Sequence, residues 1–177
     1  KVVFEKDVTD VIRQLAMPHG VFEIKCESVE ELTANGTDAV TFMFSANKGY
    51  APENMAKAAS GGELSRLMLA IKSIAAKNNY IPTLIFDEID TGVSGRVADA
   101  VGDIINTLSE SMQVIDITHL PQVAAKGNTH LLVYKEQGVT HLRPLTDQER
   151  VVEIAKMLSG STITDAALSQ ARHLLGK

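Results

Sequence analysis

Three features of the sequence predict an α/β fold. Apolar residues recur at three- and four-residue spacings over residues 64–75 and again over 97–108, which is the pattern of amphipathic helices. Between these helices, residues 84–86 are apolar on both faces, as the central strands of parallel sheets are. A second apolar strand is predicted at residues 114–117, directly after the second helix. Helices that alternate with apolar strands are typical of α/β domains.

Length and composition restrict the class of protein. The chain has 177 residues, of which 45% are hydrophobic, so it can bury the core of one domain. A net charge of −5 without a long basic run does not predict a broad nucleic-acid-binding face. The single cysteine excludes an internal disulfide and fits a reducing compartment. No apolar run reaches membrane-spanning length and no signal peptide is visible. Because the chain starts at Lys1 rather than at methionine, we expect a fragment of a longer protein.

Residues 1–50 are predicted to form a short helix and a β-hairpin. Pro18 ends the helix. The apolar face of this helix is formed by Val8, Val11, Ile12 and Leu15. Apolar and polar residues alternate over 21–28 and over 39–47, which predicts two strands, and Asn35-Gly36 between them is a turn signal.

The same patterns of apolar, polar and turn residues give expectations for Cys26 and for two further segments. We expect Cys26 to pack on the apolar face of the hairpin rather than to carry chemistry. Residues 47–59 are predicted to be a connecting loop. Residues 129–145 alternate around a short turn and predict a second hairpin that extends the sheet.

Two helices are predicted to close the chain. The first starts at Thr146, where Glu149 completes a capping box, and ends at Ser159-Gly160. The second covers about residues 164–175.

The stretch Ser60-Gly61-Gly62 opens the helix whose apolar stripe begins at Leu64. Serine is a good cap, but two glycines in a first turn are unusual because glycine is a poor helix former. Their lack of side chains leaves the amides of the helix N-terminus bare, which suits an anion such as phosphate. An ordinary capped helix with a flexible entry explains these residues equally well.

Polar residues follow both predicted strands. Asp87 and Glu88 come directly after the first strand, and His119 follows the second. Ligands of open α/β sheets bind outside the carboxyl ends of strands. A carboxylate there can hold Mg²⁺, a neighbouring one can polarise a water, and a histidine can contact a phosphate. Each residue alone is common at strand ends, but together with Ser60-Gly61-Gly62 they form a set used in phosphoryl transfer.

At these residues the sequence resembles ABC-type ATPases. "SGGELSR" is similar to the ABC signature motif, and "TLIFDEID" is similar to a Walker B strand with its catalytic glutamate. "TGVSG" stands at the D-loop position, and "ITHLPQVA" resembles the H-loop. The wording of these motifs, with "LAMPHGVFEI" before them and "EIAKMLSG" after them, resembles the RecN family of bacterial DNA repair proteins, which are SMC-like ATPases. The resemblance covers nearly the whole chain.

The resemblance implies the C-terminal lobe of an ABC/SMC-type P-loop NTPase head, with a mainly parallel sheet, flanking helices and an N-terminal β-hairpin. Residues 1–177 would form one domain, with the helix and hairpin in 1–50 and the four motifs in 51–177. A Walker A lobe and a coiled coil would precede this segment in the family. The sequence contains no Gly-x-x-x-x-Gly-Lys-Ser/Thr motif, so we expect the chain alone to be inactive.

The resemblance also implies roles for individual residues. The signature residues would contact the γ-phosphate of ATP held by an opposing head; they are Ser60, Gly61, Gly62 and Glu63. Asp87 would serve Mg²⁺ through water, Glu88 the attacking water, and His119 the γ-phosphate or that water. The D-loop residues near the head–head interface would be Asp90, Gly92 and Ser94. Many ABC proteins have an aspartate where this chain has Ser94, which leaves a D-loop carboxylate role without its usual residue.

The implied function is ATP hydrolysis in recombinational repair of DNA double-strand breaks. The cofactors would be ATP and Mg²⁺, and the partners would be the protein's own Walker A lobe, a second head and, through the full-length protein, DNA. The location would be the bacterial cytoplasm, in association with the nucleoid and without a membrane.

Three other functions remain open at this point. A transporter nucleotide-binding domain shares these motifs but usually has Asp-Glu-Pro, where this chain has Asp87-Glu88-Ile89-Asp90. A non-catalytic head dimerisation module would not need Glu88. A serine hydrolase could use Ser60, Asp87 and His119, but Ser-Gly-Gly at a helix start is not a nucleophile elbow.

Overall fold

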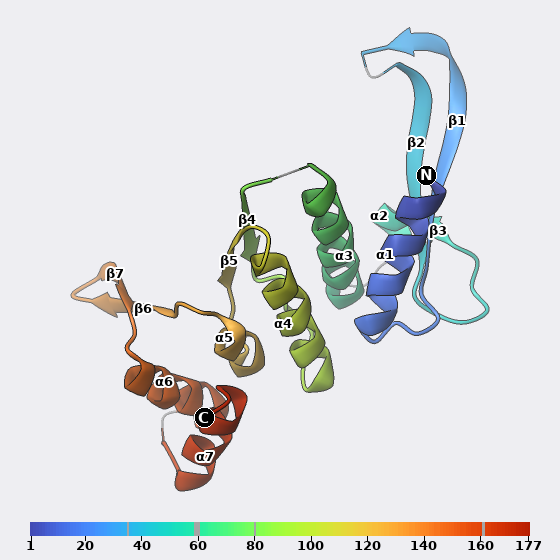
Figure 1. The fold of residues 1–177 in the computed structure, drawn as a ribbon. Helices are drawn as coiled ribbons and strands as arrows, with labels where there is room; N and C mark the ends of the chain where they lie inside the picture. The colour runs from blue at the N-terminus through green and yellow to red at the C-terminus, as the bar shows by residue number, and fades with distance from the viewer. Residues whose placement is uncertain (35, 59–60, 80, 161) are drawn as a thin grey trace.

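The structure is a computed structural model that describes residues 1–34, 36–58, 61–79, 81–160 and 162–177. Helices and strands alternate along much of the chain (Figure 1). The elements are α1 (Val2–Gln14), β1 (Val21–Thr33), β2 (Gly36–Ser45), β3 (Glu53–Asn54), α2 (Met55–Ala58), α3 (Gly61–Asn79), β4 (Thr83–Asp87), α4 (Arg96–Ser109), β5 (Gln113–Ile117), α5 (Pro121–Lys126), β6 (Leu131–Glu136), β7 (Val139–Pro144), α6 (Asp147–Ser159) and α7 (Asp165–Leu174).

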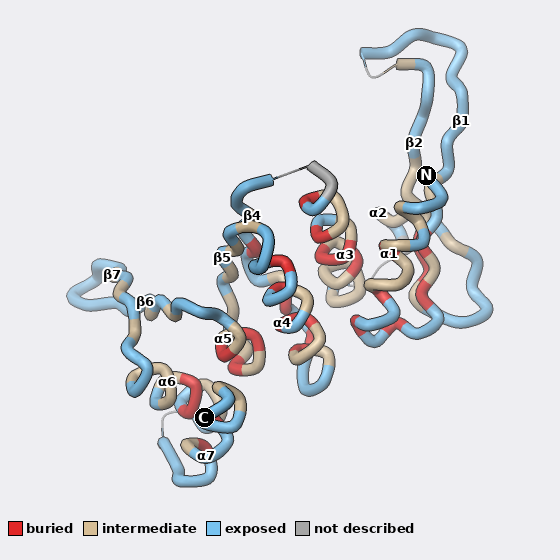
Figure 2. Tube along the Cα trace, viewed as in Figure 1, coloured by how far each residue is buried: buried red, intermediate tan, exposed pale blue. Residues whose placement is uncertain are grey.

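The N-terminal helix and hairpin form as predicted, and the hairpin is longer than expected. β1 pairs antiparallel with β2, and Phe22 lies opposite Phe44 at its base. Both phenylalanines are buried against α1. The outer half of the hairpin projects beyond α1 and is exposed along its length (Figure 2). The predicted loop at 47–59 contains two short elements, β3 and α2.

The prediction that Cys26 packs on the apolar face of the hairpin is wrong. Cys26 is exposed, and its partner across the ladder, Val40, is 59% exposed. The reason is that α1 covers only the base of the hairpin, and none of the described residues covers the apolar face farther out.

The middle of the chain is an α/β unit. β4 and β5 pair in parallel, from Thr83 opposite Gln113 to Asp87 opposite Ile117. Phe86 on one face belongs to the main core with α1, α3 and α4. The opposite face is uncovered, since Ile85 is 59% exposed. Within the described residues, parallel pairing is confined to β4 and β5, and the other strand pairs are antiparallel.

The prediction that the hairpin β6–β7 extends the sheet is wrong. The hairpin forms a separate two-stranded sheet instead of extending β4–β5. After β5 the chain enters α5, a helix that the sequence did not predict. This helix packs against α4 and α6, so the hairpin begins away from the edge of the parallel pair.

The helices α6 and α7 confirm the predicted C-terminal pair. The Thr146 hydroxyl accepts a hydrogen bond from the Glu149 amide at 3.3 Å, and the Glu149 carboxylate accepts from the Thr146 amide at 2.9 Å, which completes the capping box. A second small core lies between these helices and α5; it contains Ala125, Ile154, Ala155, Ala167 and Ala171. Among the described residues, no helix is long and apolar enough to cross a membrane.

Candidate functional site

The carboxyl ends of β4 and β5 bring the predicted polar residues together. Asp87 is the last residue of β4 and lies opposite Ile117, the last residue of β5. The Glu88 amide donates a hydrogen bond to the Ile117 carbonyl at 3.0 Å, so the pairing of the two strands continues one residue beyond Asp87. His119 follows two residues after β5. Asp87, Glu88 and His119 therefore leave the same edge of the sheet, as the sequence predicts.

Glu88 has an unusual backbone. Its φ is +49°, a left-handed conformation that non-glycine residues rarely adopt. The turn that follows holds it in place, because the Glu88 carbonyl accepts from the Thr91 amide at 3.2 Å and from the Thr91 hydroxyl at 2.8 Å. Strained residues of this kind collect at functional sites, where the surrounding structure maintains them. The side chains of Asp87 and Glu88 are both exposed and can reach a ligand.

Asp90 points inward. Its side chain is 1% exposed, and its Oδ2 accepts a hydrogen bond from the Thr118 hydroxyl. Its Oδ1 lies 3.7 Å from Nδ1 of His119, whose side chain is 64% exposed. The resemblance implies a position for Asp90 near a head–head interface; within this chain its carboxylate faces Thr118 and His119. Gly92 and Ser94 of the same turn are exposed.

Asp116 of β5 is a buried carboxylate near Asp90 that the sequence reasoning missed. Both its carboxylate oxygens are buried and have no hydrogen-bond partner among the described residues. Burial, and secondarily the nearby Asp90 carboxylate, raise the pKa of Asp116 to about 7. The available signal was a carboxylate inside an apolar strand, in "QVIDIT".

The raised pKa of Asp116 predicts a pH-dependent stability. The folded chain holds a proton that an unfolded aspartate, with an ordinary pKa of 3.8, releases. Stability should therefore fall as pH rises between these two values and level off above about 7. An asparagine side chain cannot ionise, so Asp116→Asn should stabilise the chain by about 1–2 kcal/mol at about pH 8 and by little at about pH 4. Thermal unfolding at both pH values tests this, with Asp38→Asn on the exposed hairpin as control. A gain that is equal at both pH values would contradict it.

The start of α3 lies against the D-loop turn. A Cβ added to Gly62 would lie 3.4 Å from the Gly92 carbonyl oxygen, and one added to Gly92 would lie 3.4 Å from the Gly62 Cα. Gly92 also has a φ of +78°, which glycine adopts readily. Gly61 differs, because no described atom lies within 4 Å of where its Cβ would be. The predicted cap, Ser60, lies outside the described residues.

These contacts give the two glycines different roles. Gly62 permits a close approach between α3 and the turn that follows Glu88. Gly61 is exposed and faces open space, so the first turn of α3 presents bare backbone there. Glu63 is half-buried in the same turn.

The donors at the strand ends fit a magnesium ion that shares its coordination with other ligands. Within the described residues, no group of three or more His, Cys, Asp or Glu side chains could hold a metal. Mg²⁺ in nucleotide sites needs only one or two protein carboxylates, because waters and phosphates complete its octahedron. The exposed carboxylate of Asp87 fits such a partial coordination.

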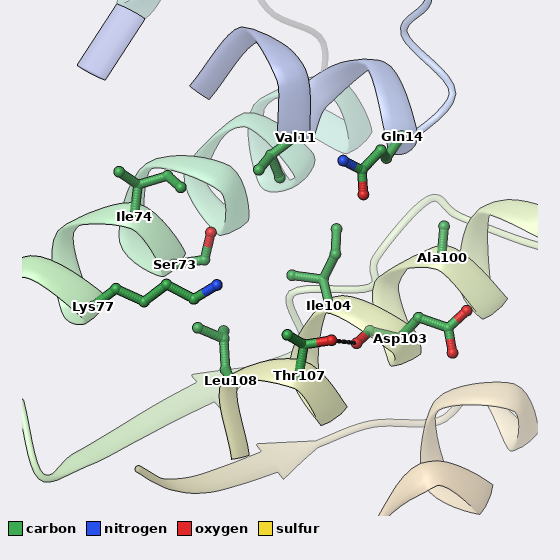
Figure 3. A pocket seen from close by; sticks show the side chains of 10 residues that line it. All are labelled: Val11, Gln14, Ser73, Ile74, Lys77, Ala100, Asp103, Ile104, Thr107 and Leu108. Carbon is green, nitrogen blue, oxygen red and sulfur yellow. Dashed lines mark hydrogen bonds between the residues drawn. The ribbon is translucent and has the colours of Figure 1, made fainter. Parts of the chain in front are cut away.

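One cavity lies away from the strand ends. It measures about 300 Å³ and opens between α1, α3 and α4, where Val11, Ser73 and Lys77 are among the lining side chains (Figure 3). None of its lining residues belongs to the strand ends or to the start of α3. At the strand ends, the side chains of Asp87, Glu88 and His119 are exposed at the surface.

Comparisons with known proteins give similar sequences. No family model matches the chain. It is 43% identical over 175 residues to "DNA repair protein RecN" of Haemophilus influenzae, covering 96% of this chain and 31% of that protein. It is 48% identical over 149 residues to RecN of Bacillus subtilis, covering 82% of this chain and 26% of that protein. RecN of Vibrio cholerae is 41% identical over 176 residues. The chain thus spans about a third of the length of these relatives.

Solved structures agree on the fold. The Smc head domain with a coiled coil and joint from Pyrococcus yayanosii has a TM-score of 0.71 at 20% identity, covering 88% of this chain and 29% of that one. A chain from a study of "ATP-driven dimerization and DNA stimulated activation of SMC ATPases" has a TM-score of 0.64 at 21% identity, covering 90% and 92%. The fold is that of an SMC head lobe. The chain is therefore similar to RecN proteins along nearly its whole length, and it corresponds to about a third of theirs.

Proposed function

We propose that this chain is the C-terminal segment of a RecN-type ATPase head that acts in recombinational repair of DNA double-strand breaks. ATP is bound and hydrolysed at composite sites between two heads, in the cytoplasm and in association with the nucleoid, and DNA is contacted through the full-length protein. The observation that carries the proposal is the shared edge formed by Asp87, Glu88 and His119, next to the start of α3.

Each residue at this edge has a distinct task. Asp87 would hold Mg²⁺ through a water molecule, and the bound ion would neutralise charge on the β- and γ-phosphate oxygens. Glu88 is exposed beyond the strand end and accepts a proton from the attacking water. His119 follows the neighbouring strand and contacts the γ-phosphate or the same water.

The signature residues act on a nucleotide held by another head. The exposed start of α3 at Gly61 offers backbone donors to an anion. The resemblance to ABC-type ATPases implies that a second head brings its bound nucleotide to these amides. Gly92 and Ser94 are exposed on the neighbouring turn and line the same interface. The SMC ATPases of similar fold are described as undergoing ATP-driven dimerisation.

The isolated chain tests the proposal directly. It should bind Mg-ATP without high affinity and should not hydrolyse it, because it lacks the Walker A lysine and amide cradle. Calorimetric titration measures the affinity, and phosphate release measures hydrolysis. Joining the chain to the N-terminal half of its own protein should restore both. Micromolar or tighter ATP binding at a single site of the isolated chain would contradict the proposal, as would no hydrolysis by the joined, folded protein.

A further inference from the structure

Asp90 is a buried carboxylate at the candidate site, and the partners that its side chain has among the described residues belong to one loop. A carboxylate that is 1% exposed needs hydrogen bonds, because burying an unpaired charge is strongly unfavourable. The Thr118 hydroxyl supplies one of them to Oδ2. The His119 ring nitrogen Nδ1 lies 3.7 Å from Oδ1. Thr118 and His119 are consecutive residues after β5, so Asp90 is directed at this loop.

The direction of the hydrogen bonds around Thr118 is fixed. Its hydroxyl oxygen accepts from the Leu120 amide at 2.9 Å, so its single hydrogen is free to point to Asp90. A chain of hydrogen bonds therefore runs from the Leu120 amide through Thr118 to the Asp90 carboxylate. It ties down the residues on both sides of His119 and leaves the imidazole itself exposed.

The second oxygen of Asp90 is an acceptor without a donor. Oδ1 is buried and finds no hydrogen-bond partner among the described residues. His119 Nδ1 lies 3.7 Å away, which is too long for a hydrogen bond but within reach of a small rotation of the exposed ring. When Nδ1 turns toward Asp90, Nε2 lies on the opposite side of the ring and faces away from the protein. A buried acceptor left unpaired is costly, which favours this orientation.

We propose that Asp90 is the positioning residue of His119, which it orients through the Thr118 hydroxyl and through Nδ1, so that Nε2 faces the γ-phosphate or the attacking water. This inference rests on the proposed function of the site. It assigns Asp90 to the H-loop of its own head, where the resemblance indicated a contact between heads. The carboxylate acts through His119 and does not itself touch the nucleotide.

The test uses the full-length protein and a matched set of variants. Asp90→Asn and Thr118→Val should each lower kcat for ATP about 10–100-fold, the usual effect of removing a group that orients a functional histidine. KM for ATP should change little, because neither residue contacts the nucleotide. Thr118→Ser keeps the hydroxyl and should recover most of the activity. Thr107→Val, which removes an exposed hydroxyl bonded to the Asp103 carbonyl in α4, controls for the loss of a threonine hydroxyl.

A double-mutant cycle separates positioning from a merely structural role. In a His119→Ala background, Asp90→Asn should cause no further loss, because the residue through which it acts is gone. An equal loss in both backgrounds would overturn the inference, and so would a Thr118→Val protein with unchanged kcat. Thermal unfolding of each variant confirms that the protein is folded.

The variant Glu88→Gln, measured alongside, distinguishes failure of this inference from failure of the proposed function. If that variant loses hydrolysis while Asp90→Asn does not, only the positioning role fails; if it hydrolyses normally, the proposed function fails.

Discussion

Glu88→Gln in the full-length protein is expected to lower the rate of ATP hydrolysis about 10²–10⁴-fold, the usual contribution of a general base. The amide has the shape of the carboxylate but cannot accept a proton from water. ATP binding should survive, because Asp87 and the nucleotide cradle are unchanged. The left-handed backbone of Glu88 imposes the same strain on glutamine as on glutamate, so the fold should be retained.

Two measurements check this expectation. Steady-state phosphate release gives the rate, and size-exclusion chromatography with ATP shows whether heads accumulate as pairs that turnover no longer separates. Glu110→Gln is the matched control, because Glu110 caps the end of α4 before the amino end of β5, opposite the candidate site. Hydrolysis by Glu88→Gln at the wild-type rate would show that Glu88 is not the catalytic base.

Ser60→Arg is expected to prevent the ATP-dependent pairing of heads while each head still binds ATP. The substitution adds a long side chain directly before Gly61, whose surroundings are open. A phosphate from a second head would then be kept from the amides of α3. Losing one such interaction in the closed state would cost about 2.7–4 kcal/mol, or about 10²–10³-fold in hydrolysis, by analogy with removal of an oxyanion donor.

The measurement for Ser60→Arg combines nucleotide binding with pairing. Fluorescent ATP should bind as it does to the wild type, whereas chemical crosslinking with ATP should give no paired heads. Ser109→Arg at the end of α4 adds the same side chain at an exposed position away from the site. A Ser60→Arg protein that pairs its heads on ATP and hydrolyses it normally would refute the role of the signature helix.

Local patterns in the sequence predicted the elements and the edge of the sheet well. The capping box at Thr146 depends only on residues four apart or fewer, so the sequence contains all of it. The ends of β4 and β5 were predicted because the apolar residues of each strand give way to polar residues at Asp87 and at Thr118. Because the two strands pair in parallel, their carboxyl ends lie side by side.

Three wrong or missing predictions depend on contacts between distant segments. The alternation of apolar and polar residues in β1 places Cys26 on the apolar face of the hairpin. Whether other residues cover that face depends on how far α1 extends along the hairpin. The hairpin β6–β7 has the right pattern for a strand pair, but α5 decides where it begins. Asp90 and Asp116 are far apart in sequence, so their shared burial could not be deduced from the sequence pattern.

The central claim is that the signature residues act between heads and the strand-end carboxylates act within one. Mixing two inactive full-length proteins tests it most directly. Ser60→Arg mixed with a Walker A lysine variant forms one composite site with both lesions and one with neither, so ATP hydrolysis should return. Glu88→Gln mixed with the same lysine variant leaves one lesion in each site, so hydrolysis should stay low. The reverse pattern, with recovery for Glu88→Gln and none for Ser60→Arg, would contradict the account.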